Sequence, residues 1–164
     1  MKSFLKGFVY AGKGIYYCLA KERNMRVHLC FTVYMFAFLT VYDFFEISKA
    51  EFGILLALCA LVMSLECVNT AIERTVNLIT KEKNPVAGAA KDAAAGAVLI
   101  AAIFAVIAGI VIMYQPEAFK KMYEYYASHI GMFIALIISV VLSLMFIFLP
   151  AKKNNGGQEG DSND

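Results

Sequence analysis

The chain carries little charge. Asp, Glu, Lys and Arg supply only 17% of its 164 residues, whereas hydrophobic residues supply 60%. A typical soluble domain has about 25% charged and about 45–50% apolar residues, so this composition excludes an ordinary soluble protein. A chain of this length could bury one core, but not several long apolar stretches. The composition predicts an integral membrane protein.

Other absences exclude further classes. The four cysteines have no C-x-x-C spacing, which gives no sign of a zinc site or a disulfide framework. Lysines and an arginine interrupt residues 1–26, so no cleavable signal peptide is evident and we expect the first spanning helix to direct insertion. The basic residues are few and lie beside the apolar stretches, so we expect no nucleic-acid partner.

What the chain contains instead is a series of long apolar stretches. A helix needs about 20 such residues to cross a bilayer. The sequence predicts an all-α membrane fold with a three-helix transmembrane core and one additional C-terminal transmembrane helix. The expected spans are residues 26–43, 52–77, 92–114 and about 129–149. The first is slightly short, and we expect Arg26 and His28 to complete it at the membrane interface.

The segments between these spans are polar. Residues 43–51 form a short acidic connection, and residues 80–88 form a loop that contains Lys, Asn and Pro. Residues 115–128 are polar and tyrosine-rich, which is typical of a membrane interface. The Gly/Asn/Asp tail that ends the chain at residue 164 is expected to be disordered.

Residues 1–21 alternate lysines with large apolar side chains. This pattern favours an amphipathic helix that lies on the membrane surface, with its lysines toward water and anionic headgroups. A plain membrane anchor is the alternative interpretation.

The basic residues also indicate an orientation. With the N-terminus inside, only Lys49, Lys120 and Lys121 of the fifteen lie outside. The positive-inside rule then places both termini and the 80–88 loop in the cytoplasm, where ATP is found. We expect a multi-pass protein of the cell membrane with a cytoplasmic active site.

The most informative stretch is residues 65–92. Its apolar helix meets Glu66 and continues with Asn69, Glu73 and Asn77, and spacings of three and four place these side chains on one helical face. A carboxylate at bilayer depth costs about 2.5–3.5 kcal/mol on the insertion scale. Such a cost predicts a functional role for Glu66.

The same boundary offers the groups that phosphoryl transfer requires. Glu22 and Glu73 are carboxylates near the ends of two helices, and Mg²⁺ usually takes one or two protein carboxylates beside phosphate oxygens. Glu66 lies seven residues deeper than Glu73, roughly 10 Å along a helix, which suits the hydroxyl of a lipid headgroup.

The motif Glu66-x-x-Asn69-x-Ala71-Ile72-Glu73, followed by Ala90-Lys91-Asp92, resembles the small prokaryotic lipid kinases, the diacylglycerol and undecaprenol kinase family. The resemblance covers residues 1–115, which it identifies as a kinase domain, with residues 116–164 as an addition. It implies phosphorylation of a membrane lipid alcohol by ATP with Mg²⁺, in a homotrimer with shared active sites.

The resemblance also implies individual roles. Glu66 is the expected general base and Asn69 orients the reacting groups, whereas Glu22 and Glu73 are the expected Mg²⁺ ligands. The remaining residues are expected to contact the nucleotide: Lys6, Tyr10, Glu82, Lys83, Asn84, Lys91 and Asp92.

The chain departs from the family pattern in two places. Asn77 stands where many members carry a carboxylate, so any charge role there is lost. The fourth span exceeds the three-span pattern, and we expect it to pack outside the core and to be dispensable for catalysis.

The substrate and the class of function have alternatives. The stretch Glu22-Arg23-Asn24-x-Arg26-x-His28 is similar to that of undecaprenol kinases, so undecaprenol is the first choice and diacylglycerol the second. A non-catalytic subunit with an ion path through Glu66 and Glu73 predicts ion flux without nucleotide hydrolysis. A scaffold that binds anionic lipid leaves Glu66 unexplained.

Overall fold

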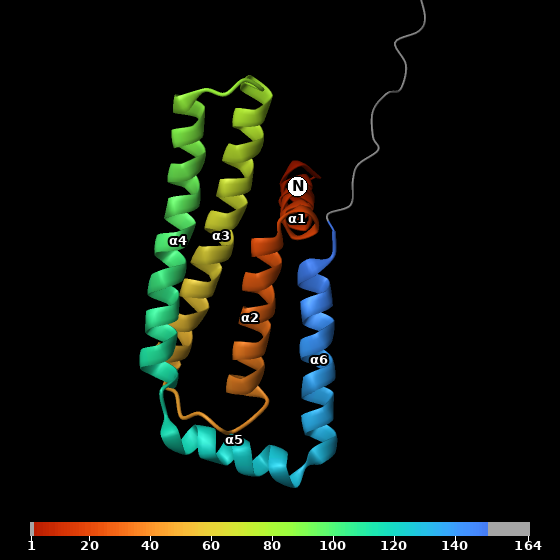
Figure 1. Cartoon of the computed structure of the whole chain (residues 1–164), viewed down its shortest axis with the longest axis vertical. Helices are drawn as coiled ribbons and strands as arrows, with labels where there is room; N and C mark the ends of the chain where they lie inside the picture. Colours follow the sequence, from red (N-terminus) through yellow and green to blue (C-terminus); the bar gives the residue numbers. More distant parts are fainter. Residues whose placement is uncertain (1, 151–164) are drawn as a thin grey trace, which may run out of the picture.

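The computed structural model describes residues 2–150, with the side chains described from residue 4. The described residues form helices joined by short turns, and no strand occurs among them. The helices are α1 (Lys2–Lys21), α2 (Arg23–Thr40), α3 (Lys49–Ile79), α4 (Pro85–Met113), α5 (Pro116–Ser128) and α6 (Ile130–Phe148). Helices α2, α3, α4 and α6 lie side by side, and α5 crosses one end of the bundle (Figure 1).

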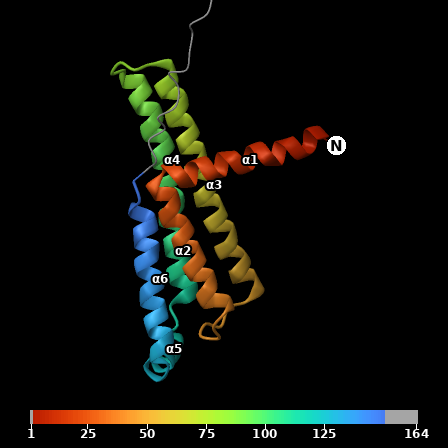
Figure 2. The same ribbon diagram turned by 90° about the vertical axis from the view of Figure 1, so that its right-hand side faces the viewer.

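Three of the described helices are long and apolar enough to cross a membrane: α3, α4 and α6. Together with the all-helical fold, this confirms the predicted class of all-α membrane protein. The first predicted span, α2, is not among the three, because its first two turns carry two arginines, an asparagine and a histidine. It nevertheless runs alongside the other three in both views (Figures 1 and 2).

The first helix leaves the bundle at a steep angle, as Figure 2 shows. Glu22 separates α1 from α2 with an extended backbone, φ −103° and ψ 120°, which breaks the helix and turns the chain. The apolar side chains of α1 are exposed in the single chain, among them Phe4, Phe8 and Tyr16. A helix steeply inclined to the rest of the bundle can lie along the membrane plane, as the predicted surface helix would require.

Helices α3 and α4 form a long hairpin that reaches beyond the level of α1 (Figures 1 and 2). The Ser48 and Glu51 side chains form a capping box at the start of α3. Asn84 caps α4 by accepting from the backbone N–H groups of Val86 and Ala87, and Pro85 occupies the first turn. The helix that contains the predicted third span therefore begins at Pro85, before residue 92.

This earlier start corrects two expectations. The loop after α3 is confined to residues 80–84, because the Asn-Pro pair starts a helix instead of prolonging the turn. Asp92 consequently lies about two turns inside α4, where the field of the helix N-terminus is weak.

The opposite end of the bundle also differs from expectation. Residues 116–128, predicted as a polar connection, form the amphipathic helix α5, which begins with Pro116 in its first turn. Its Ala118 and Tyr126 are buried against Phe44 and Phe45 of the connection between α2 and α3. Burial of the aromatic side chains in this cluster stabilises the helix. The polar composition of the segment gives no sign of this contact.

A pair of hydrogen bonds joins the same two segments. The Glu46 backbone N–H donates to Gln115 Oε1 at 3.0 Å, and Gln115 Nε2 donates to the Glu46 carbonyl at 2.9 Å. The chain then turns into α6, which matches the predicted fourth span within a residue at each end. The predicted disordered tail, with Lys152 and Lys153, lies outside the described residues.

Candidate functional site

Glu66 is the buried carboxylate of the bundle. Its exposed fraction is 3%, although it lies on a helix most of whose side chains are at least partly exposed. Its Oε1 lies 3.4 Å from His28 Nε2 on α2. Thr70, one turn further along α3, is also buried and donates its hydroxyl to the Glu66 carbonyl at 2.9 Å. A charge at this depth needs a partner, and His28 is the side chain that supplies one.

Asn69 lies one turn beyond Glu66 on α3. The side chain is half-buried, and its Oδ1 is buried without a hydrogen-bond partner among the described residues. A buried amide oxygen without a donor is uncommon in folded proteins. Because it lies on the same helical face as Glu66, it is available to a bound donor such as a hydroxyl or a water.

The junction between α1 and α2 is anchored on α3. Arg74 Nη2 lies 3.5 Å from Glu22 Oε1, and its guanidinium stacks 5.5 Å from the centre of the Tyr17 ring. Arg74 directly follows Glu73 in α3, so the contact brings Glu22 to the turn of α3 that carries Glu73. The two carboxylates that the sequence analysis assigned to Mg²⁺ therefore belong to neighbouring parts of the fold.

These carboxylates fit a magnesium ion in donor chemistry. Among the described residues, no three His, Cys, Asp or Glu side chains gather as a complete ligand set. Mg²⁺ does not require one, because it usually keeps several waters and binds through one or two carboxylates plus substrate phosphates. Glu22 and Glu73 offer hard oxygen donors of that kind.

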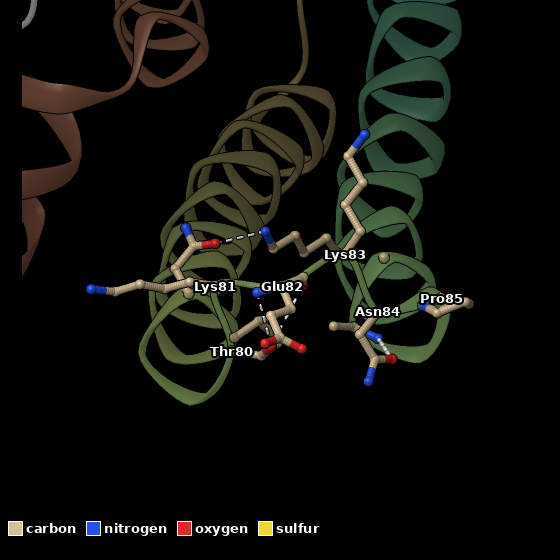
Figure 3. Close-up of a pocket in the computed structure, with 11 residues that line it drawn as sticks. Thr80, Lys81, Glu82, Lys83, Asn84 and Pro85 are labelled. Carbon is tan, nitrogen blue, oxygen red and sulfur yellow. Dashed lines mark hydrogen bonds between the residues drawn. The ribbon is translucent and has the colours of Figure 1, made fainter.

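A polar cleft of about 790 Å³ lies where α3 and α4 meet. It brings together four residues predicted to bind the nucleotide, Glu82, Lys83, Asn84 and Lys91. Figure 3 shows the loop that forms its edge. Two cationic side chains from the loop, Lys81 and Lys83, and one from α4 give the cleft the charge that a phosphate chain requires.

One hydrogen bond spans the cleft. Lys91 Nζ donates to Asn77 Oδ1 at 2.7 Å, which joins α4 to α3. Asn77 therefore acts as a neutral acceptor for Lys91. A neutral partner leaves the positive charge of Lys91 uncompensated, so that it can attract an anion.

Three predicted contacts do not line this cleft. Lys6 and Tyr10 are exposed on α1, and Asp92 is exposed on α4. In a single chain these side chains lie apart from the residues that gather between α3 and α4.

An apolar cavity of about 540 Å³ opens on the other side of the Glu66–His28 pair. Its walls come from α2, α3 and α4, and Phe119 of α5 closes one part of it. The wall from α3 runs from Leu55 to Val62, one turn before Glu66, and His28 itself lines the cavity. The buried carboxylate thus lies at the polar edge of an apolar space.

Two residues of this region have roles that sequence reasoning missed. His28 and Arg26 were expected at the membrane interface, but His28 contacts Glu66 and Arg26 is buried, with 5% of its surface exposed. The contact of His28 joins residues that are distant in the sequence. The only sign of these roles in the sequence was that both residues are polar and lie at the start of an apolar stretch.

Comparison with known proteins points to one family. A family model of prokaryotic diacylglycerol kinase matches residues 9–113. An undecaprenol kinase of Bacillus subtilis (strain 168) is 43% identical over 114 residues, which cover 68% of this chain and 89% of the relative.

Two diacylglycerol kinases are also similar. That of Synechocystis sp. is 38% identical over 115 residues, 70% of this chain and 64% of the relative. That of Helicobacter pylori (strain J99) is 32% identical over 106 residues, 63% of this chain and 78% of the relative. No solved structure matches the chain. The match over residues 9–113 and the identity to these kinases show that the chain belongs to the prokaryotic diacylglycerol kinase family and is a membrane lipid kinase that uses ATP.

Proposed function

We propose that this kinase phosphorylates undecaprenol, giving undecaprenyl phosphate, with Glu66 as its general base. The observation that carries the proposal is the order of features along α3. The apolar cavity borders residues 55–62, the buried Glu66 follows, and the polar cleft begins at Val76. At 1.5 Å per residue, roughly 15 Å of helix separates Glu66 from the start of the cleft. In this order, the apolar cavity would take the lipid chain, Glu66 would face the lipid hydroxyl, and the polar cleft would take the nucleotide.

In the proposed reaction, the lipid hydroxyl approaches Glu66 from the side of the cavity. Glu66 takes its proton while the hydroxyl oxygen attacks the γ-phosphorus of ATP, the bond to the β-phosphate oxygen breaks, and ADP leaves. Asn69 Oδ1, which lacks a donor among the described residues, accepts a hydrogen bond that orients the reacting groups. His28 holds the Glu66 carboxylate toward α2.

Other residues would bind the nucleotide. Glu22 and Glu73 would hold Mg²⁺, which neutralises charge on the phosphates when bound. Lys83 and Lys91 of the cleft attract the phosphates, and Glu82 and Asn84 complete its wall. Asp92, Lys6 and Tyr10 lie outside the cleft, and we propose that they reach the nucleotide of the site shared with a neighbouring subunit in a homotrimer.

The positions of the helices and loops support a cytoplasmic location for the polar cleft. The α3–α4 loop and α1 lie toward one end of the bundle, and α5 lies at the other (Figure 1). The first end carries most of the basic residues, as the positive-inside rule requires of a cytoplasmic end. We propose the cell membrane as the location, with the N-terminus, the C-terminal tail and the site facing ATP.

Substrate preference tests the proposal. The purified protein should transfer labelled γ-phosphate from ATP to undecaprenol with a higher kcat/KM than to diacylglycerol, each lipid presented in the same detergent micelles. The support for this order is the identity to the undecaprenol kinase, 43% against 38% for the diacylglycerol kinase of Synechocystis. A preference for diacylglycerol would overturn the substrate and leave the lipid kinase intact.

Removing the charge of Lys91 should weaken nucleotide binding. In Lys91→Met we expect the KM for ATP to rise about tenfold or more, because a hydrogen bond to a charged group is worth about 1.5–3 kcal/mol. The KM for the lipid should stay unchanged, since the cleft and the apolar cavity are separate. Lys120→Met, at an exposed position of α5, is the matched control. An unchanged KM for ATP would exclude Lys91 from the nucleotide site.

A further inference from the structure

The last helix, α6, is attached to the rest of the bundle by polar contacts. It packs on α2 and α5 and on no other described helix. The Tyr34 hydroxyl of α2 donates to Ser139 Oγ at 3.0 Å and lies 3.0 Å from Ser143 Oγ. The two serines are four residues apart, so they lie on one face of α6. The other side chains of α6 are apolar, so these hydrogen bonds specify α2 as the helix against which α6 packs.

A second attachment lies at the end of α6. Arg26 of α2 donates two hydrogen bonds from one nitrogen, to the carbonyls of Phe146 and Leu149, each at 2.8 Å. Its guanidinium also lies 5.8 Å from the centre of the Phe146 ring. The last carbonyls of a helix have no partner within it and form its negative end. The last turn of α6 has no basic residue of its own, so Arg26 supplies the positive charge from α2.

Arg26 lies between two residues, Glu22 and His28, whose charged or polar side chains contact α3. Glu22, the N-cap of α2, contacts Arg74, and His28 contacts Glu66. Helix α6 does not pack against α3 or α4 within the described residues, so any influence on the site must pass through α2, α5 or the connection between α2 and α3. Of Glu22, Arg26 and His28, Arg26 is the residue that donates hydrogen bonds to α6.

We propose that α6 is a positioning element of the kinase site, and that Arg26 is the positioning residue through which it holds Glu22 and His28 against α3. Without the α6 carbonyls the buried guanidinium would lack acceptors, and the first turns of α2 would have to move to hydrate it. The inference rests on the proposed roles of Glu22, His28 and Glu66. It differs from the expectation, drawn from the three-span pattern, that the fourth span is dispensable.

The test compares variants of the full chain by kcat per folded molecule. Arg26→Met should lower kcat about 10–100-fold, because small displacements of catalytic groups have effects of that size. Arg26→Lys keeps the charge and should recover part of the loss. A residue that only supports folding would reduce the yield or thermal stability of the protein while the folded fraction kept the wild-type kcat.

The hydrogen bonds of Tyr34 give a second test, which does not depend on whether Arg26→Met folds. Tyr34→Phe and the double variant Ser139→Ala/Ser143→Ala should each lower kcat. Because the Tyr34 and the serine variants remove the same interaction, combining them should lower kcat no further than either variant does alone. Tyr123→Phe and Ser128→Ala, both at exposed positions of α5, are matched controls that should keep the wild-type kcat.

Three results would overturn the inference: wild-type kcat in folded Arg26→Met, wild-type kcat in both the Tyr34 and the serine variants, or losses that multiply when the Tyr34 and serine variants are combined. A wild-type protein that labels neither undecaprenol nor diacylglycerol would instead overturn the proposed substrates, so the two failures are distinguishable.

Discussion

The Glu66→Gln enzyme is expected to phosphorylate lipid about 10²–10⁴-fold more slowly than the wild type, the usual effect of losing a positioned general base. Glutamine has the shape of glutamate but cannot take the hydroxyl proton. The Thr70 hydrogen bond goes to the backbone carbonyl of residue 66, so the substitution leaves it in place. The rate is measured as transfer of labelled γ-phosphate at saturating ATP and undecaprenol.

The matched control is Glu124→Gln, at an exposed position of α5. It removes the same charge from the chain and should keep the wild-type rate. If Glu66→Gln kept the wild-type rate, Glu66 would not be the base, although the protein would still be a kinase. Loss of activity without loss of thermal stability would separate a chemical role from a structural one.

The second large effect is expected at Glu73. In Glu73→Gln, kcat/KM for ATP should fall about 10²-fold, because the site loses one of the two carboxylates proposed to hold the metal. The Mg²⁺ concentration that gives half-maximal activity should rise with it. The KM for the lipid should not change, since Glu73 lies on the far side of Glu66 from the apolar cavity.

Titration of Mg²⁺ at fixed ATP distinguishes this role from a structural one. A Glu73→Gln enzyme that is slow but has the wild-type Mg²⁺ dependence would contradict the ligand assignment. Glu117→Gln, at an exposed position of α5, serves as the control of equal charge.

The polar face of α3 could be predicted from the sequence because it depends on a single helix. Glu66, Asn69 and Glu73 are separated by three and four residues, and an α-helix places such residues on one face whatever surrounds it. The burial of Glu66 followed from the apolar stretch that precedes it. The helix ends were harder, because Asn84 and Pro85 resemble a loop unless the cap is recognised.

The contacts between helices could not be read in the same way. His28 and Arg26 lie two residues apart in one turn of α2, yet one reaches Glu66 of α3 and the other the carbonyls of α6. Neither partner is near in sequence. The helix at residues 116–128 was missed for a similar reason, because Ala118 and Tyr126 bury their surface against Phe44 and Phe45, more than 70 residues earlier.

The sequence alone determined the all-α membrane class and the carboxylate face of α3. These features follow from composition and from the fixed geometry of a helix, which act within a short stretch of chain. Only the tertiary structure decided which side chain faces Glu66, which residues gather in the cleft and what holds α6. Those outcomes depend on how whole helices pack, because a buried charge takes its partner from whichever helix lies within reach.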